Sequence, residues 1–290
     1  MEFSPERLDR FARQIVIPEV GGAGQFTLAQ AHVALVGLGG IGSPALQYLA
    51  GAGIGRLTLI DDGKVELGNL HRQTIYSERD IGHGKVVAAS RWLANFDHKL
   101  TLTLHDRRID AESAPGMIAG ADLVLDGTDT FATRLAVADA CVAEGVPLLS
   151  AAVGRFQGQV GAFAGHLPDQ ACYRCYVGDA FDADDCDTCA EDGMLGAMAG
   201  WAGTLAALQA VRLLVAPAMG EPQWSTLHLL DGLAPSMRSF RVAKDPGCRT
   251  CGTAGQGVSE PIAPASAPPT RAQARLPGPG ASHRTTPNLD

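Results

Sequence analysis

HVALVGLGGIGSPALQYLAGAG, residues 32–53, holds a short apolar run, a glycine-rich turn and a helical pattern in direct succession. The apolar, β-branched run predicts a strand, and Pro44 is tolerated in the first turn of the helix that follows. Gly37, Gly39, Gly40 and Gly42 permit a tight turn and a close approach to phosphate. The free N–H groups of the helix N-terminus attract anions. This order predicts a nucleotide site at the turn.

Strand and helix patterns alternate on both sides of this segment. The first thirty residues predict an arm and a helix with a Gly-rich turn at 21–24. Further strands are expected at 56–61, 99–105, 122–126 and 146–152, and helices at 85–96, 111–119 and 131–145. Alternation of this kind predicts an α/β protein with a Rossmann-like, doubly wound, mostly parallel sheet covered on both faces.

The pattern changes after residue 152. Another strand is expected at 158–165, and two C-terminal antiparallel strands at 224–232 and 236–244. The uncharged segment 193–211 is weighed as a membrane span or a buried core helix, and its many small residues favour the core helix. Residues 256–290 hold seven of the 17 prolines and predict a disordered tail, which leaves one folded domain over 1–255.

Charge and composition exclude several classes of function. The 23 basic and 31 acidic residues give a net charge of −8, which argues against nucleic-acid binding. Hydrophobic residues make up 46% of the chain, too many for global disorder. The N-terminus lacks the apolar region of a signal peptide. We therefore expect a cytoplasmic protein that does not bind a membrane.

Polar residues beyond the turn refine the ligand. Asp61 ends the second strand, where an acid can bind ribose hydroxyls, so a nicotinamide-dependent oxidoreductase is the first interpretation. Arg72 and Lys85 add two cations that better suit a triphosphate, although no P-loop sequence occurs. Asp129 follows the fourth strand at the ligand-binding edge, where it could hold Mg²⁺ or cap a helix in competition with Thr130.

Six of the seven cysteines form three Cys-x-x-Cys pairs. Two such pairs can make a Cys₄ zinc site, so the spacing alone leaves three combinations open. Cys141 lies in an apolar helical pattern and is expected in the core. The members of the three pairs are Cys172 with Cys175, Cys186 with Cys189, and Cys248 with Cys251.

The motifs together resemble the ThiF/MoeB/HesA family of adenylyltransferases, bacterial relatives of the ubiquitin-activating enzymes. The similarity covers about residues 5–252. It is carried in order by RFARQIVIPE (10–19), GGAGQ, VGLGGIGSP, LTLIDDGKVELGNLHRQ (57–73), DLVLDGTDTFATR (122–134), CYRC, CAEDGMLG and CRTCG.

The resemblance implies an enzyme that uses ATP and Mg²⁺ to adenylate the C-terminal Gly carboxylate of a ubiquitin-like sulfur carrier. The glycine turn would hold phosphates and Asp61 the ribose, while Asp129 would hold Mg²⁺. Arg13 would reach the site of a neighbouring subunit, which requires a homodimer. The residues implied to contact the triphosphate are Asn69, Arg72 and Lys85, and Gln73 is a further residue expected to bind the nucleotide.

The resemblance also selects Cys172, Cys175, Cys248 and Cys251 as ligands of Zn²⁺. Cys189 matches a family cysteine that carries a covalent link in some members, but its acidic neighbourhood disfavours the thiolate. Its role stays open. Cys186 departs from the family pattern and could form a disulfide with Cys189, compete for metal or be a spare thiol.

The sequence thus predicts a homodimeric adenylyltransferase acting on a carrier of thiamine or molybdopterin cofactor biosynthesis, with the pathway left open. No sulfurtransferase domain is seen after residue 255, so a separate sulfurtransferase or desulfurase is expected to supply the sulfur. The two alternatives are a nicotinamide-dependent oxidoreductase and a catalytically silent carrier-binding scaffold.

Overall fold

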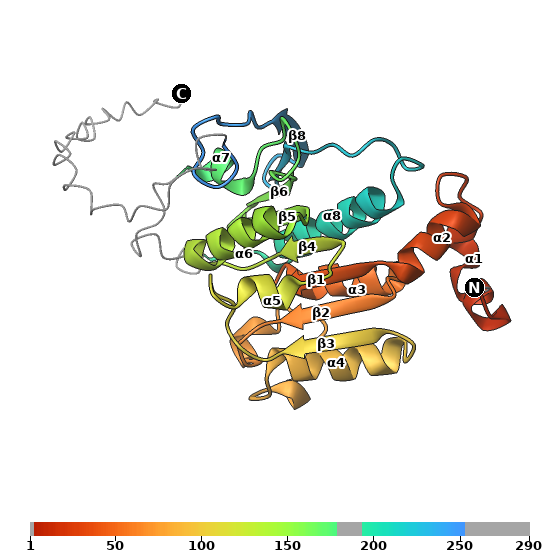
Figure 1. The fold of residues 1–290 in the computed structure, drawn as a ribbon. Coiled ribbons are helices and arrows are strands. Elements are labelled where there is room, and N and C mark those ends of the chain that lie inside the picture. The colour runs from red at the N-terminus through yellow and green to blue at the C-terminus, as the bar shows by residue number, and fades with distance from the viewer. Residues whose placement is uncertain (1–2, 179–192, 253–290) are drawn as a thin grey trace, which may run out of the picture. The chain divides into compact units, whose positions relative to one another are not determined.

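A computed structural model of the chain describes residues 3–178 and 193–252. Cys186, Cys189 and the tail at 256–290 lie outside the described residues. The described part contains one eight-stranded sheet with the order β3-β2-β1-β4-β5-β6-β7-β8, drawn in Figure 1. The strands are β1 (His32–Val36), β2 (Arg56–Ile60), β3 (Thr101–His105), β4 (Leu123–Asp126), β5 (Leu148–Gly154), β6 (Gln157–Phe163), β7 (Thr226–Asp231) and β8 (Ser236–Arg241).

The direction of pairing changes once along the sheet. Strands β3 to β5 are parallel, and β6, β7 and β8 continue the sheet in antiparallel pairs. β1 lies between β2 and β4, so the order reverses at β1, the point where ligands bind in doubly wound folds. The predicted parallel sheet with C-terminal antiparallel strands is confirmed.

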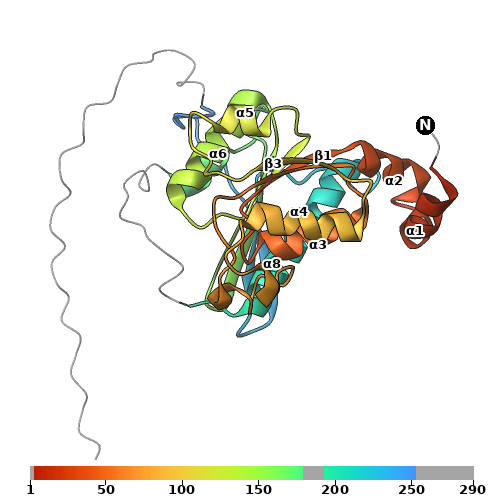
Figure 2. The same ribbon diagram turned by 90° about the horizontal axis from the view of Figure 1, so that it is seen from below.

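Helices cover both faces of the parallel part, as Figure 2 shows. α3, α4 and α8 pack on one face, against Val33 and Leu35 of β1. α5, α6 and α7 pack on the other, against Ala34 and Val36. Alternate residues of one strand therefore serve two cores. The helices are α3 (Gly42–Ala52), α4 (Lys85–Phe96), α5 (Ala114–Ile118), α6 (Phe131–Glu144), α7 (Tyr173–Val177) and α8 (Gly196–Val215), with the short 3₁₀ helices η1 (Leu67–Asn69) and η2 (Glu78–Asp80).

α8 is long and apolar enough to cross a membrane by length and composition, and half of its most apolar window is buried. Ala199, Ala202 and Ala206 are fully buried in the core shared with α3 and the sheet. At Gly203 an added Cβ would lie 2.3 Å from the carbonyl oxygen of Ile41. This close packing confirms the predicted core helix.

The N-terminal region differs from the expectation. It forms two helices, α1 (Pro5–Ile15) and α2 (Gly21–Gln30), so the predicted Gly-rich turn at 21–24 is wrong and these residues begin α2. A Cβ on Gly24 would lie 2.8 Å from a methyl group of Val215. This glycine therefore allows α2 to approach the end of α8.

Candidate nucleotide and metal sites

The turn between β1 and α3 is shaped by its glycines. Gly37 has a φ of +84°, a left-handed conformation that side chains disfavour. A Cβ on Gly42 would lie 1.9 Å from the carbonyl oxygen of Gly37, so no other residue fits there. The Gly37 N–H donates to Ile60 O over 2.8 Å, which fixes the turn to the end of β2.

Asp61 follows β2 and braces the same turn. Its Oδ2 accepts the Leu38 N–H over 2.6 Å, and its Oδ1 accepts the Gly63 N–H over 2.7 Å. Lys85, the first residue of α4, places Nζ 3.8 Å from Asp61 Oδ1. A carboxylate has about four acceptor positions, so Asp61 retains capacity for hydroxyl donors.

Three further predicted residues gather around η1. Arg72 donates through Nη2 to Asn69 Oδ1 over 2.9 Å and through Nη1 to Gly68 O over 3.0 Å. Its stem lies against the glycine turn, because a Cβ on Gly40 would be 3.3 Å from Arg72 Cδ. Asn69 therefore orients the guanidinium beside the turn.

Gln73 is buried, with a 2% exposed side chain, and its Nε2 would lie 3.8 Å from a Cβ on Gly39. Its Oε1 is buried without a hydrogen-bond partner among the described residues. Native proteins rarely leave such an atom unsatisfied. The orphaned Gln73 Oε1 beside a phosphate-type turn offers an acceptor that a hydroxyl or amine of a nucleotide can satisfy.

The β4–α6 connection carries Asp129. Its side chain is exposed, and Thr130 rather than Asp129 occupies the N-cap position of α6, so Asp129 has no capping role. Asp129 and the glycine turn lie at the same edge, since Gly127 N–H donates to Val36 O over 2.9 Å. This placement is compatible with the expected role of Asp129 toward Mg²⁺.

Sequence reasoning missed Asp126, the last residue of β4. It is fully buried, its Oδ1 accepts the N–H and hydroxyl of Thr128, and its Oδ2 has no partner among the described residues. Burial raises the pKa of Asp126, although the Arg134 guanidinium opposes this shift. The signal was an acid ending the apolar run LVLD.

Arg134 of α6 holds the connection from the other side. It is 5% exposed and donates to the carbonyl oxygens of Thr128 and Ala151 and to the Ser150 hydroxyl. These bonds tie the loop between β4 and α6 to β5. The arrangement fixes the backbone from which Asp129 projects.

Arg13 lies apart from these residues within one chain. It is exposed on the last turn of α1, and neighbouring Gln14 donates to Gly51 O near the far end of α3. Gly51 is nine residues beyond Gly42, about 14 Å along the helix axis. Figure 1 shows α1 at the end of the sheet opposite the arrowheads of β2 and β3.

Four cysteines form a compact cluster between α7 and the segment after β8. The sulfurs of Cys172, Cys175, Cys248 and Cys251 lie within 4.8 Å of one another. Measured separations are 3.8 Å for 172–175, 3.6 Å for 172–248 and 3.4 Å for 175–251. Disulfide sulfurs would lie at about 2.05 Å, whereas four sulfurs around Zn²⁺ at 2.3 Å are about 3.8 Å apart. The cluster fits Zn²⁺.

The surroundings of one thiol in the cluster favour its ionised form. Cys175 Sγ accepts hydrogen bonds from the Cys172 thiol and from the Asp245 N–H. These two bonds, the Cys172 bond foremost, lower the pKa of Cys175. Cys141, in contrast, is 2% exposed in the core as predicted.

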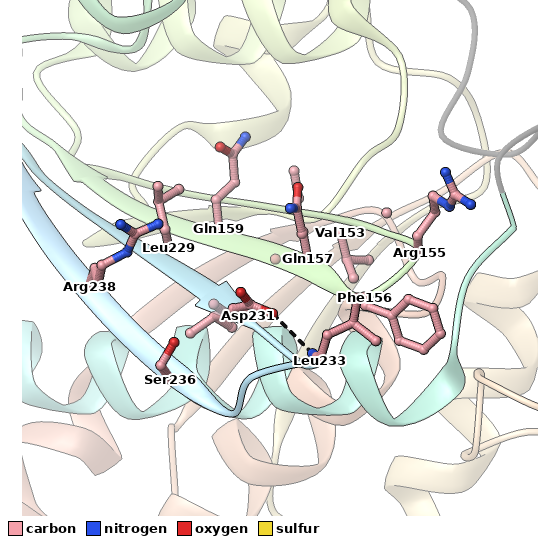
Figure 3. Close-up of a pocket in the computed structure, with 14 residues that line it drawn as sticks. Val153, Arg155, Phe156, Gln157, Gln159, Leu229, Asp231, Leu233, Ser236 and Arg238 are labelled. Carbon is pink, nitrogen blue, oxygen red and sulfur yellow. Dashed lines mark hydrogen bonds between the residues drawn. The ribbon is translucent and has the colours of Figure 1, made fainter. Parts of the chain in front are cut away.

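A pocket of about 720 Å³ lies over the antiparallel strands (Figure 3). Gln159, Leu229 and Arg238 line it in one row across β6, β7 and β8. Arg155 and Phe156 line it at the β5–β6 turn. The Asp231 carboxylate, which also lines the pocket, accepts the Leu233 N–H over 2.9 Å. This pocket is separate from the glycine turn, which contributes none of its lining.

The strand order, the glycine turn and its cationic neighbours define a nucleotide-binding protein of the Rossmann-like class with an added cysteine centre. Residues 11–250 match the ThiF family. The chain therefore belongs to the ThiF family.

Named relatives agree with this assignment. The sulfur carrier protein adenylyltransferase of Thermus thermophilus is 37% identical, with 87% of this chain and 93% of the relative covered. The molybdopterin-synthase adenylyltransferase of Salmonella typhimurium is 37% identical, with 87% and 99% covered. The sulfur carrier protein ThiS adenylyltransferase of Escherichia coli is 37% identical, with 84% and 94% covered. None of these names supports an oxidoreductase or a silent scaffold.

Solved structures show the same fold at lower identity. Escherichia coli MccB is 22% identical, with a TM-score of 0.72 and coverage of 84% of this chain and 72% of that protein. PaaA is 19% identical, with a TM-score of 0.70 and coverage of 83% and 75%.

Proposed function

We propose that this protein is an ATP-dependent adenylyltransferase that activates the C-terminal glycine carboxylate of a ubiquitin-like sulfur carrier. The observation that carries the proposal is the gathering of Asp61, Asn69, Arg72, Gln73 and Lys85 around the glycine turn. Relatives named for this activity match nearly their whole length.

The chemistry suits a site without a general base. A carboxylate oxygen of the carrier attacks the α-phosphorus of ATP, forming the acyl–phosphate bond while the bond to the β-phosphate oxygen breaks and pyrophosphate leaves. The attacking carboxylate is already ionised near neutral pH. The enzyme has to align two anions and stabilise the charge that moves to pyrophosphate.

Each residue around the turn then has one task. Backbone N–H groups of the turn and of the α3 N-terminus bind phosphate oxygens, and Asp61 accepts bonds from the ribose hydroxyls. Arg72, oriented by Asn69, and Lys85 neutralise the triphosphate, while Gln73 Oε1 accepts a hydrogen bond from a hydroxyl or amine of the nucleotide. Mg²⁺ held by Asp129 would supply charge neutralisation at the leaving phosphates.

The pocket over β6–β8 is the proposed docking place for the carrier. It lies at the carboxyl end of β5, next to β4 in the sheet, and Arg155 and Arg238 give it positive charge. Exposed Phe156 and Leu233 add apolar surface beside these cations. Such a surface suits a folded carrier whose anionic tail extends toward the nucleotide edge.

A homodimer is proposed because Arg13 cannot reach the site of its own chain. Tyr48 on α3 and Leu208 on α8 are 57% and 51% exposed on two helices that pack together. Exposed Val16 and Ile17 follow α1. Exposed apolar side chains of this kind could be buried in a twofold dimer, the assembly that a role of Arg13 at the partner's site requires.

The remaining assignments are also proposals. Cys172, Cys175, Cys248 and Cys251 would hold a structural Zn²⁺, and one folded domain would extend over residues 1–255, while the predicted tail at 256–290 lies outside the described residues. Relatives named adenylyltransferase and sulfurtransferase are matched over only 53–58% of their length. A separate sulfurtransferase or desulfurase and a cytoplasmic location are also proposals. A covalent role for Cys189, which lies outside the described residues, is also a proposal.

Carrier-dependent ATP–pyrophosphate exchange tests the proposal. The purified protein is incubated with labelled pyrophosphate, ATP and Mg²⁺, with either the thiamine-type or the molybdopterin-type carrier of the same cell. We expect exchange with at least one intact carrier and none with a carrier lacking its last glycine. Exchange with neither intact carrier would overturn the proposed function.

A further inference from the structure

One carboxylate contacts both turns of the cysteine cluster. Asp139 of α6 accepts two hydrogen bonds from Arg174, Nε to Oδ1 and Nη2 to Oδ2, each 2.8 Å long. The same Oδ1 accepts the hydroxyl of Thr250 over 2.7 Å. Arg174 lies between Cys172 and Cys175, and Thr250 lies between Cys248 and Cys251.

The two turns have to be brought together before a metal can bind. They are far apart in the chain, so their meeting costs loop-closure entropy. Four thiolates also repel one another at the observed separations of 3.4–3.8 Å between neighbouring sulfurs. Asp139 provides a common acceptor that does not depend on the metal.

We propose that Asp139 is the positioning residue of the four-cysteine centre: it holds the two Cys-x-x-Cys turns in the geometry that Zn²⁺ requires. The Arg174 guanidinium is 6% exposed and pairs with Asp139 in the bidentate arrangement, which is geometrically specific. Because the Arg174–Asp139 pair is neutral overall, it adds no net charge beside the thiolates.

The contacts of Asp139 with Arg174 and Thr250 also attach the four-cysteine centre to α6. Asp139 lies on α6, five residues after Arg134, which ties the nucleotide-edge loop to β5. The segment after β8 is thereby fastened to a helix of the parallel half of the fold. Groups that support metal ligands in this way change metal affinity by about 10–100-fold when they are removed.

Metal release measures the proposed role directly. Full-length protein loaded with Zn²⁺ is mixed with excess 4-(2-pyridylazo)resorcinol, and the release rate and competition Kd are followed by absorbance. We expect Asp139→Asn to release Zn²⁺ faster than wild type and to raise the Kd for Zn²⁺ by about 10–100-fold. Glu144→Gln is the matched control, an exposed acid on the same helix, and should behave as wild type.

Circular dichroism must first show that each loaded variant is folded. If Asp139→Asn fails to fold, Thr250→Val removes only the hydroxyl donor and should weaken Zn²⁺ binding by a smaller factor, with Co²⁺ charge-transfer bands still reporting four thiolates. A folded Asp139→Asn variant whose Zn²⁺ release rate and Kd equal those of the wild type would overturn the proposal. So would a wild-type protein that binds no Zn²⁺. Neither result depends on adenylation activity.

Discussion

Two carboxylates, at the ends of the strands on either side of β1, have opposite surroundings. Asp61 accepts two backbone N–H groups and faces Lys85, so its charge is well compensated. Asp126 is fully buried with one oxygen unpartnered, and burial raises its pKa. The first suits a ligand contact at the site surface, and the second suits a buried brace under the Thr128 loop.

Asp126→Asn should alter how stability depends on pH. In the unfolded chain this carboxyl ionises near its ordinary pKa of 3.8, whereas the folded protein retains the proton to higher pH. The wild-type free energy of unfolding therefore falls as pH rises above about 4, by up to 1.4 kcal/mol per pH unit, until the folded pKa is reached. Asn mimics the protonated form, so the stability of Asp126→Asn relative to wild type should increase as the pH rises from below 4 toward neutrality.

Urea unfolding at each pH measures this difference. Asp9→Asn is the control, because Asp9 is exposed on α1 and should leave the pH profile unchanged. A constant difference between Asp126→Asn and wild type across this range would show that Asp126 does not carry the raised pKa.

Arg72→Ala should lower carrier-dependent pyrophosphate exchange by about 10²–10³-fold, the usual cost of losing one donor to developing charge. Arg72→Lys should recover only part of the rate, because an ammonium cannot keep the planar contacts to Asn69 and Gly68. Exposed Arg79 of η2 provides the control as Arg79→Ala. Equal rates for the two alanine variants would remove Arg72 from the site.

Much of the candidate site could be predicted at this scale. Asp61, Arg72 and Lys85 follow a predicted strand within one continuous segment, so their meeting at one edge follows from the parallel topology. Asp126 escaped notice because its distinctive property is the missing partner of one oxygen, which only packing reveals. The position of Arg13 could not be derived, since nothing local specifies where α1 docks.

At the scale of elements, helix α3 offers a matched pair of glycines. Gly42→Ala would place Cβ 1.9 Å from Gly37 O, so the turn must distort, and both nucleotide binding and stability should fall. Gly51→Ala on the same helix meets no atom within 4 Å and should raise stability by about 0.5–1 kcal/mol. Thermal unfolding measures the change in stability, and titration calorimetry with ATP measures the change in nucleotide affinity.

Unchanged ATP affinity in Gly42→Ala would contradict the geometry proposed for the turn. The Gly51 variant shows whether any loss merely reflects placing alanine in α3. A comparable loss of ATP affinity in both variants would point to the helix as a whole rather than to the turn.

The sequence predicted element types well wherever periodicity and punctuation agreed. Helix α6 ends with Gly145 in the left-handed conformation, as its sequence indicates. The Gly-rich segment 21–24 was wrongly predicted as a turn, because local glycine content outweighed the tertiary contact between Gly24 and Val215. Glycine served packing there, and packing partners distant in sequence cannot be identified from local composition.

For the whole molecule, subunit mixing tests the shared site. A dimer of Arg13→Ala and Arg72→Ala chains contains one site with both changes and one site with neither, if Arg13 acts on its partner. Mixing two nearly inactive variants under subunit exchange should restore about one working site per mixed dimer. Pyrophosphate exchange measures the recovery, and each variant alone is the control. No recovery despite confirmed mixing would place Arg13 outside the partner's site.

The product of the first step tests the central claim most directly. The protein is incubated with ATP, Mg²⁺ and a carrier ending in Gly-Gly, and the intact mass of the carrier is measured at once under acidic quench. Our account predicts a carrier heavier by one adenylyl group, that is AMP less one water, located on its last glycine, and no such species when Arg72 is replaced by alanine. A carrier of unchanged mass while ATP is consumed would contradict carboxylate adenylation.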